Sequence, residues 1–562
     1  MAPLGVAQAS SALASLALRP AHLFVALVAF LAVQLTYWPD VLFTDLATSG
    51  AQLARALRRE PPRPPAAAGA PREDLYAVFA ALVAPHGYAL QEHFVTTEDG
   101  YVLRLFRMAN TSFLPGGSFP PAPAGGSNAS GGVGGGSGGS SRSSGTPGGG
   151  GKGVGSGGGG GGGVPALRVA FLQHPLMGSA VDWVVMGPGR SVAFLLADRG
   201  YDVWLTNVRG NRFSRNHTSL DPDSPEDAPR FWGYSFDHHI AYDLLAALEH
   251  VGGATGAERV AVVAYSQGTT IILGALSAHP SIAARVSAAA LLAPVAFVGG
   301  MTSPVFRAMA VLRMERLFRL LGMHEYGPHL PHFAALSAAF CGAFPAPCTA
   351  YLTLLSPNAN IDPALMPSIM TFLPSGTSSV NMQHWGQLVR SPNATRLARF
   401  DFGTDCGPTS TTATSPSGAG AGGGEAGDPA LADNETGDAG GSGGSAERAP
   451  HLSAGLPLTR DRAPSRAGGD GDGRPRCNQD AYGGSTVPPE YPLASVSTPL
   501  ALFTGGHDSL GDPADSQRLL QVLRAPVLHH HTPEYGHLDF GVGADVAQRV
   551  YPVLLDFLDA HP

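Results

Sequence analysis

The sequence has little charge, few cysteines and no cluster of basic residues. Only 14% of its 562 residues are charged, and the net charge of −8 is spread along the chain. Without a basic patch, a nucleic-acid partner is not expected. Four cysteines in a chain of this length do not make a disulfide scaffold. Cys341/Cys348 and Cys406/Cys477 are therefore either disulfides in an oxidising compartment or ordinary buried thiols.

The sequence also lacks the patterns that bind metals and phosphates. The run His529–His531 has no spaced partner residues, so packing at the end of a strand explains it better than metal ligation. The glycine-rich tracts lack the Lys-Ser/Thr pair and the helix start that a phosphate-binding loop requires. We therefore expect neither a metal nor a cofactor.

Glycine and proline are abundant instead, with 74 and 48 residues, and two tracts hold many of them. Residues 111–166 and 405–477 lack the apolar side chains that offset ordering entropy, so both are predicted to be disordered insertions. The rest suits one large domain with an inserted subdomain. The predicted segments are an N-terminal hydrophobic anchor or signal with its linker (1–71), an N-terminal hairpin region (72–110), a first core part (167–296), a helical cap or lid (297–404) and a second core part (478–562).

The first 38 residues contain no acidic residue, and Leu23–Trp38 is almost entirely apolar. This segment is long for a signal peptide and slightly short for a membrane span. Tyr37-Trp38 suits an aromatic belt and no cleavage site follows closely, which favours an uncleaved membrane anchor in the secretory, endomembrane or vacuolar–lysosomal route. Secretion and organelle targeting are the alternatives. Five glycosylation sequons mildly favour the secretory route, at Asn110, Asn128, Asn216, Asn393 and Asn434.

Apolar runs of strand length alternate with helical patterns in the two core parts. This alternation predicts a mainly parallel α/β sheet with its site at the carboxyl ends of the strands. His86–Arg107 is predicted to form a hairpin. Residues 297–402 show helical but no clear strand patterns, which indicates an inserted helical cap. The main predicted strands begin near Leu167, Tyr201, Val260, Ala288, Thr498 and Val527, and the predicted helices include Ser191–Gly200, Asp237–His250, Val305–Leu321 and Asp545–Leu558.

The segment Ala264-Tyr-Ser266-Gln-Gly268 lies between the strand starting at Val260 and a helical pattern that ends at His279. It is a variant of the G-x-S-x-G nucleophile elbow, which holds its serine on a strained turn between strand and helix. Small flanking residues let strand and helix approach. Ser266 is therefore the candidate nucleophile.

A nucleophilic serine needs a histidine base, and that histidine needs a carboxylate to fix its tautomer. Asp508 follows a late strand through Gly505-Gly506, which lets the loop turn at the edge of the sheet. His537 lies just beyond the last strand, so the three residues come in the order Ser, Asp, His that α/β-hydrolases use. Backbone N–H groups should stabilise the oxyanion. Gln267, which follows the nucleophile, supplies one. Leu176 is expected to supply the other.

The chain resembles the acid lipase family, which includes gastric and lysosomal acid lipases. The resemblance covers roughly residues 76–110, 167–404 and 478–560 and implies a capped α/β-hydrolase whose lid opens on a lipid surface, with the same triad and oxyanion donors. The motifs that carry it are His93–Leu103, Gln173-His174, Asp182-Trp183, Leu195–Trp204, Asn207–Asn211, Phe213–Arg215, Phe231-Trp232, Ser235–Asp237, Tyr242–Leu244, Ser266–Thr270, Asn381–Trp385, Phe400–Gly403, Gly505–Asp508 and His537–Phe540.

Two departures from the family pattern lie at the site. The usual Gly-His-Ser-Gln-Gly is Ala-Tyr-Ser-Gln-Gly here, so Tyr265 replaces a histidine beside the nucleophile. The usual His-Gly of the oxyanion loop is His174-Pro175; proline has no N–H, which leaves the amide of Leu176 as donor but stiffens its approach.

These observations predict a serine carboxylic ester hydrolase, a triacylglycerol or steryl ester lipase that works through an acyl-enzyme at a lipid–water interface, as a monomer. A short-chain esterase or thioesterase on the same scaffold is one alternative. A catalytically silent lipid-binding protein is the other.

Overall fold

The computed structural model describes residues 74–119, 167–357, 359–392, 394–406 and 477–562. The predicted N-terminal anchor and most of both predicted insertions lie outside these residues. Among the described residues no single helix is long and apolar enough to cross a membrane. One bent pair, Pro331–Ala343 with Pro345–Thr353, meets the length and composition requirements only jointly, with an angle of 111° between its halves. Contacts divide the chain into two units, residues 1–401 with 488–562 and residues 402–487.

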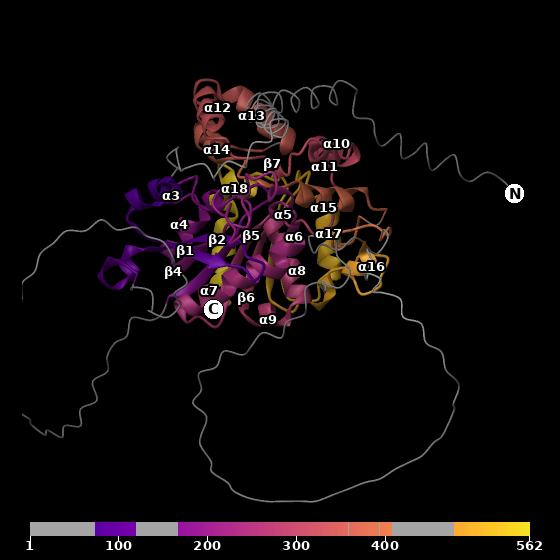
Figure 1. The fold of residues 1–562 in the computed structure, drawn as a ribbon. Coiled ribbons are helices and arrows are strands. Elements are labelled where there is room, and N and C mark those ends of the chain that lie inside the picture. The colour runs from indigo at the N-terminus through magenta and orange to yellow at the C-terminus, as the bar shows by residue number, and fades with distance from the viewer. Residues whose placement is uncertain (1–73, 120–166, 358, 393, 407–476) are drawn as a thin grey trace, which may run out of the picture. The chain divides into compact units, whose positions relative to one another are not determined.

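One mainly parallel sheet forms the centre of the first unit (Figure 1). The described strands are β1 (Tyr88–Thr96), β2 (Val102–Asn110), β3 (Arg168–Gln173), β4 (Tyr201–Leu205), β5 (Val260–Tyr265), β6 (Val286–Leu292), β9 (Leu500–Gly505) and β10 (Val527–Thr532). Their order is β1-β2-β4-β3-β5-β6-β9-β10. The hairpin β1–β2 and the pair β2–β4 are antiparallel and the other pairs are parallel, as the alternation of strands and helices predicts.

Helices cover both faces of this sheet because its central strands are apolar on both sides. Along β5, Val260, Val262 and Ala264 belong to one core cluster, whereas Ala261, Val263 and Tyr265 belong to the other. The first face is packed by α6 (Phe236–His238), a π-helical turn (His239–Asp243), α7 (Leu244–Thr255), α8 (Gln267–Ala278), α9 (Pro280–Ala284) and α17 (Pro513–Val522). The second is packed by α3 (Leu75–Val83), α4 (Val192–Asp198), α18 (Asp539–Val542), α19 (Val546–Arg549) and α20 (Tyr551–Asp559).

Six further helices, which we call the cap helices, lie at the carboxyl end of the sheet (Figure 1). They are α10 (Pro304–Val311), α11 (Met314–Leu320), α12 (Pro331–Ala343), α13 (Pro345–Leu355), α14 (Met366–Phe372) and α15 (Ser379–Arg390). A small core of their own contains Met366 and Ile369 together with the disulfide Cys341–Cys348. Another short helix, α5 (Ala228–Phe231), precedes α6.

Two predicted helices were wrong in detail, and one small sheet was not predicted. The predicted helix Val305–Leu321 is two helices, α10 and α11, because Arg313 adopts left-handed backbone angles (φ 50°, ψ 45°) between them. The predicted terminal helix is likewise α19 and α20, since Pro552 cannot donate the N–H that a continuous helix needs. A two-stranded sheet also joins β7 (Glu325–Tyr326) to β8 (Thr377–Ser378) where no strand was predicted. Strands of two residues are too short to show a period.

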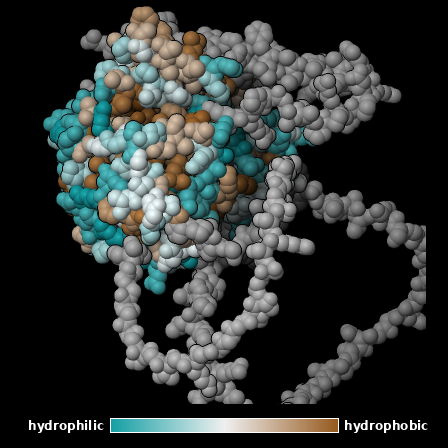
Figure 2. All heavy atoms as spheres, turned by 90° about the vertical axis from the view of Figure 1, so that its left-hand side faces the viewer, coloured by the Kyte–Doolittle hydropathy of each residue, from teal (hydrophilic) through white to brown (hydrophobic). Residues whose placement is uncertain are grey.

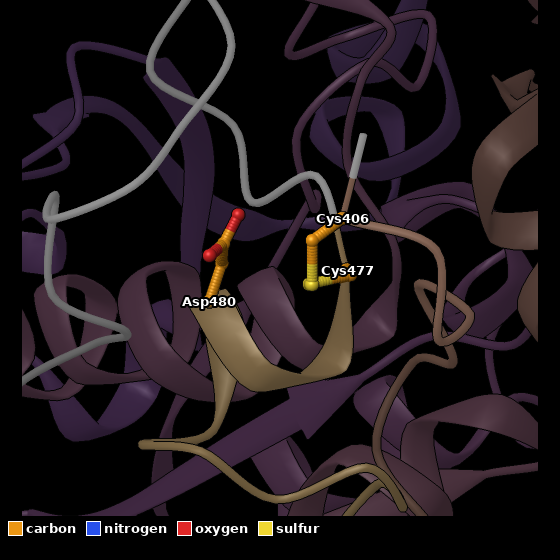
Figure 3. Close-up of side chains that lie close together, drawn as sticks. All are labelled: Cys406, Cys477 and Asp480. Atoms are coloured by element: carbon orange, nitrogen blue, oxygen red, sulfur yellow. A yellow bond between two sulfur atoms is a disulfide. The ribbon is translucent and has the colours of Figure 1, made fainter. Parts of the chain in front are cut away.

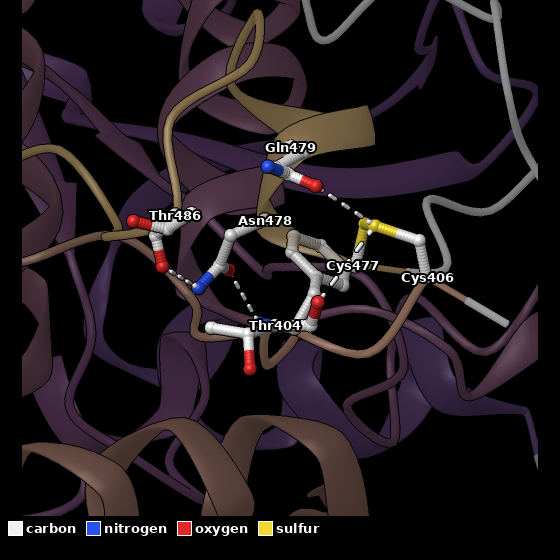
Figure 4. The surroundings of a disulfide bond; sticks show 7 residues. Thr404, Cys406, Cys477, Asn478, Gln479 and Thr486 are labelled. Carbon is white, nitrogen blue, oxygen red and sulfur yellow. Dashed lines mark hydrogen bonds between the residues drawn. A yellow bond between two sulfur atoms is a disulfide. The ribbon is translucent and has the colours of Figure 1, made fainter.

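The second unit is described over residues 402–406 and 477–487. The disulfide Cys406–Cys477 joins the two described segments at the start of α16 (Asn478–Ala481). The side chain of Asn478 bridges them, because its Oδ1 accepts from Phe402 N (2.9 Å) and its Nδ2 donates to Thr486 O (2.9 Å; Figure 4). The carboxylate of Asp480 lies within 4.8 Å of the sulfur atoms (Figure 3). Two sulfurs bonded to each other offer no thiolate to a metal ion.

Candidate active site

Ser266 lies on a strained turn between β5 and α8. Its backbone angles are φ 53° and ψ −122°, in a region that residues with a side chain rarely adopt. Gly268 permits the close packing behind this turn, because a Cβ there would lie 2.3 Å from the carbonyl oxygen of Gln173 in β3. The Ser266 N–H donates to the carbonyl of Leu292 at 3.0 Å, which ties the turn to β6. The strand, turn and helix expected of a nucleophile elbow are all present here.

The structure brings Ser266, His537 and Asp508 together. His537 Nε2 lies 2.8 Å from Ser266 Oγ, and His537 Nδ1 lies 2.9 Å from each Asp508 oxygen. Since a carboxylate only accepts, Nδ1–H donates to Asp508 and leaves Nε2 to accept the serine proton. The N–H groups of Leu510 and Gly511 also donate to Asp508 Oδ1, at 2.9 and 2.8 Å, and fix the carboxylate. All three side chains are buried.

Gly505 and Gly506, before Asp508, are required by close packing and not by the turn that the sequence suggested. A Cβ on Gly505 would lie 2.2 Å from the carbonyl oxygen of Tyr535, and a Cβ on Gly506 would lie 2.2 Å from that of Pro533. The loop that carries His537 therefore crosses directly over these glycines. Any side chain at either position would push His537 away from Asp508.

Tyr265, at the end of β5, contacts the loop that carries His537. Its hydroxyl donates to the His537 carbonyl at 3.0 Å, and the two rings stack with centroids 5.6 Å apart and planes 29° apart. Gly541 makes room for the ring, because a Cβ there would lie 2.9 Å from Tyr265 Cε1. Burial raises the pKa of Tyr265 well above its ordinary value, so the hydroxyl is a donor at neutral pH. The sequence showed the replacement of histidine by Tyr265 but not this contact.

The loop after β3 forms a tight turn over residues 175–178. Gly178 N–H donates to the Pro175 carbonyl at 3.1 Å, and Met177 has a φ of 56°, as in a type II turn. His174 anchors the turn: its Nε2 accepts from Val208 N (3.0 Å), so its Nδ1–H donates to the Pro175 carbonyl (2.8 Å). Burial lowers the pKa of His174 to about 4, which keeps this neutral tautomer. Pro175 thus sits at the first position of a fixed turn, immediately before Leu176.

Leu176 and Gln267, the predicted oxyanion donors, line the same cavity as Ser266. In the part of the chain that the structure describes, neither backbone N–H is used in a hydrogen bond to a carbonyl. The Gln267 side chain is held by the cap helix α15, because its Oε1 accepts from Asn381 Nδ2 (2.9 Å) and Trp385 Nε1 (2.7 Å). The sequence placed Asn381 and Trp385 in a family motif of the cap without indicating this contact.

The cap also holds the loop of His537 on its far side. Ser356, which follows α13, accepts at Oγ from Leu538 N (3.1 Å). Asp539 accepts from Asn360 N at Oδ1 and from Gly536 N at Oδ2, both at 2.6 Å. Burial raises the pKa of Asp539 to about 6, although these two N–H donors oppose the shift. His537 therefore lies between the core residue Tyr265 and a segment of the cap.

Asp182 is a half-buried acid close to the oxyanion loop, and its role was not predicted. Its Oδ2 accepts from Ser179 N at 2.7 Å in a capping box. Burial raises the pKa of Asp182 to about 7, only partly opposed by this hydrogen bond. A Cβ on Gly178 would lie 2.2 Å from the same oxygen. Asp182 thus packs tightly against the turn that presents Leu176.

A cavity of about 900 Å³ opens beside Ser266 and extends between the cap helices. This volume is near the upper end of the range of about 300–1,000 Å³ that is usual for ligand sites. Among the described residues that line it, none is lysine or arginine, and most are apolar. Its lining includes Ser266 and His537 and, from the cap helices, Phe306, Met309, Phe318, Phe333, Leu352, Ile369 and Trp385.

Comparison with known proteins agrees with this geometry. A model of the alpha/beta hydrolase fold matches residues 172–330, and a model of a partial alpha/beta-hydrolase lipase region matches residues 79–124. Human lipase member K is 27% identical over 84% of this chain and 89% of its own length. Rat gastric triacylglycerol lipase is 28% identical over 84% and 89%.

Human gastric triacylglycerol lipase is 30% identical over 68% of this chain and 77% of its own length. This alignment runs over 394 residues, so the similarity is not confined to the serine motif. The chain has the α/β-hydrolase fold and belongs to the acid lipase family of gastric triacylglycerol lipase and lipase member K.

Proposed function

We propose that this protein is a lipase that hydrolyses the carboxylic ester bonds of neutral lipids, triacylglycerol or steryl ester. One observation carries the proposal: the hydrogen-bonded series Ser266–His537–Asp508 opens directly into an apolar cavity of about 900 Å³. The series supplies an activated nucleophile and the cavity accommodates acyl chains.

In the proposed reaction, Ser266 Oγ attacks the ester carbonyl while His537 Nε2 takes its proton. The backbone N–H groups of Leu176 and Gln267 stabilise the oxyanion of the tetrahedral intermediate. His537 then gives the proton to the departing alcohol, which leaves an acyl group on Ser266. Water, activated by His537, releases the fatty acid. Asp508 accepts from His537 Nδ1–H throughout and holds the imidazole in the required tautomer.

The charge of the cavity favours an uncharged ester. A thioester of a phosphorylated carrier would need cations for its phosphates, and the described lining offers no lysine or arginine. Of the three lining acids, Glu315 and Glu325 are paired with Arg390 and Arg215, and burial raises the pKa of the third, Asp182, to about 7. The size of the cavity likewise favours long acyl chains over the short chains of a soluble esterase.

The test compares wild type with Ser266→Ala on emulsified triacylglycerol, emulsified steryl ester and a water-soluble short-chain ester. A lipase turns over at least one emulsion, and the variant retains no more than background activity. Labelling by a fluorophosphonate should be lost in Ser266→Ala and kept in a control variant, Ser277→Ala, in the same helix region. Turnover of the soluble ester alone would favour the short-chain esterase. Lipid binding without turnover or labelling would favour the silent lipid-binding protein.

We propose further that the protein follows the secretory route as a monomer. Both cysteine pairs form disulfides, as expected in an oxidising compartment. Of the described sequons, Asn216 is exposed, whereas the Asn110 amide donates to Asp198. Glycosylation is therefore proposed at Asn216. A membrane anchor over residues 23–38 remains a prediction.

A further inference from the structure

The outer face of α10 and α11 is unusually apolar for a surface, and it also carries arginines. Leu320 is 83% exposed, Val311 64% and Leu312 60%, and Leu317 and Leu321 are exposed as well. Arg313 and Arg316 are exposed among them, and in the described part of the chain neither forms an ion pair. We call the surface of residues 311–321 the α10–α11 patch.

The backbone conformation at Arg313 helps to expose the apolar side chains of the patch. Arg313 adopts φ 50° and ψ 45°, a conformation that costs a residue with a side chain about 1–2 kcal/mol. This corner separates the two helices and leaves Leu312 and Arg313 on the outside. A single continuous helix would have avoided the strain. Strained backbone of this kind is concentrated at functional surfaces.

The charge of the patch is opposite to that of the whole chain, whose net charge is −8. Glu315, the one acid within the patch, is buried and pairs with Arg390. Burial and the nearby positive charges of Arg313 and Arg316 lower the pKa of Arg390, although Glu315 opposes the shift. Three guanidinium groups therefore lie close together with one buried acid, and the outer face presents positive charge.

The inner face of the same two helices lines the cavity beside Ser266, through Phe306, Met309 and Phe318. The opposite rim belongs to α12, where Leu336 and Phe340 line the cavity and are also exposed, 68% and 49%. Residues 326–361, which include α12 and α13, contain no Asp, Glu, Lys or Arg. Hydrophobic side chains are visible at this end of the molecule in Figure 2, and Figure 1 shows all four helices there.

We propose that the α10–α11 patch binds an anionic lipid surface and orients the mouth of the cavity toward it. This proposal deepens the proposed lipase function and rests on it. Exposed leucines interleaved with arginines are the pattern of helices that lie in a lipid–water interface, where apolar side chains enter the acyl boundary and arginines meet anionic headgroups. The arginines make the preference for negative surfaces specific to α10–α11, since α12 and α13 carry no charge.

A second copy of the chain fits the α10–α11 patch less well than an anionic lipid surface does. A symmetric contact through this patch would place Arg313 and Arg316 against the same residues of the other copy, and like charges destabilise such a contact. An anionic lipid surface instead neutralises the arginines while it covers the leucines.

The test uses the full chain carrying Ser266→Ala, so that lipid is bound but not cleaved. Binding is measured by flotation with phosphatidylcholine vesicles and with vesicles that also contain phosphatidylglycerol. In this background, Arg313→Asn with Arg316→Gln is compared with the matched control Arg518→Gln with Arg524→Gln, two exposed arginines in and after α17. Asn is chosen at position 313 because it tolerates left-handed angles.

Removal of the two patch arginines should lower binding to phosphatidylglycerol vesicles roughly 25-fold, about fivefold for each cation near the surface, with little change on phosphatidylcholine alone. The control pair should change neither. High salt should abolish the preference for phosphatidylglycerol. Equal binding of the parent protein to both vesicles, or equal losses in the patch and control pairs, would overturn the proposal. Self-association lost with the patch arginines would instead assign the patch to a second copy and also overturn it.

A separate measurement keeps this outcome distinct from failure of the lipase assignment. With Ser266 intact, the patch variant should hydrolyse a water-soluble short-chain ester with the kcat/KM of wild type, because the patch does not touch the catalytic groups. If wild type hydrolyses no ester, the proposed function fails, while the vesicle binding of the Ser266→Ala proteins still decides whether the patch recognises anionic lipid.

Discussion

Replacement of Tyr265 by phenylalanine should slow catalysis without weakening substrate binding. The change removes the hydroxyl that donates to the His537 carbonyl and keeps the ring that stacks on the His537 imidazole. His537 would keep its hydrogen bonds to Asp508 and Ser266, but its backbone would lose one of its supports. Because the hydroxyl contacts the base and not a reacting atom, Tyr265 is a positioning residue.

The expected loss of kcat in Tyr265→Phe depends on how many other hydrogen bonds hold the loop of His537. A neutral hydrogen bond contributes about 1 kcal/mol net, which is about fivefold in a rate constant when all of it is lost in the transition state. Leu538 and Gly536, on either side of His537, keep their bonds to Ser356 and Asp539. We therefore expect kcat to fall by up to about fivefold. Tyr265→Ala should do more, because loss of a buried aromatic ring costs about 3–5 kcal/mol of stability.

The assay is steady-state hydrolysis of a water-soluble ester, with the free energy of unfolding measured in parallel. Tyr551→Phe is a matched control, since the Tyr551 hydroxyl also donates to a buried backbone carbonyl, that of Phe540, at 3.0 Å. Both variants should lose similar stability, but only Tyr265→Phe should lose kcat, at unchanged KM. A raised KM with unchanged kcat, or the same kcat loss in Tyr551→Phe, would refute the positioning role.

Three further predictions concern the supports of the site. Asn381→Ala leaves the Gln267 side chain with one donor instead of two, so kcat on a soluble ester should fall about tenfold, a fraction of the 10²–10³ that loss of a whole oxyanion donor costs; an unchanged kcat would show that Gln267 needs no clamp. Arg209→Met should lower the free energy of unfolding by about 3–5 kcal/mol, because it leaves Asp99 and Asp243 without their buried partner; urea unfolding against the exposed control Arg230→Met measures this, and equal losses would contradict it. Asp182→Asn should change the pH dependence of stability. The folded carboxyl, with a pKa of about 7 against an ordinary 3.8, binds a proton that the unfolded chain lacks between these pH values, so wild type loses about 4 kcal/mol from this group as pH rises from 3.8 to 7. Relative to wild type the variant should thus be more stable at pH 8 than at pH 4, and an identical difference in unfolding free energy at both pH values would contradict the raised pKa.

The part of the site that could be predicted from the sequence is the part that local patterns encode. Ser266 and Asp508 each follow an apolar run of strand length, and His537 follows the last predicted strand, Val527–His531. Parallel strands place their carboxyl ends at one edge of a sheet. The order of the three residues then assigned the base and the acid before their distances were known. The same reasoning placed Leu176 and Gln267 beside the cavity.

What could not be predicted depends on contacts between distant residues or on single backbone angles. Tyr265 and His537 are 272 positions apart, and Asn381 lies 114 positions from Gln267. No period or motif links such pairs. Arg313 breaks a helical pattern although its sequence contains neither glycine nor proline at that point, so the strained corner is set by packing. The sequence suggested that Gly505 and Gly506 allow a turn, whereas glycine is needed there because the loop of His537 crosses directly over both residues.

The hydrogen bonds of the cap restrict how the site can open. If the whole cap moved as one body, α15 would release Gln267, and the segment after α13 would release Leu538 and Asp539. Those bonds hold Gln267, a proposed oxyanion donor, and the loop of His537, the proposed base, so such a movement would displace the groups that it is meant to uncover. Opening that preserves catalysis must leave α15 and residues 356–361 where they are. It then involves the helices α10 to α14, whose inner faces line the cavity. The outer faces of α10–α11 and α12 carry the exposed leucines, Phe340, and Arg313 and Arg316, which form no ion pair within the described part of the chain. The helices free to move thus include the helices that can exchange their contacts for a lipid surface.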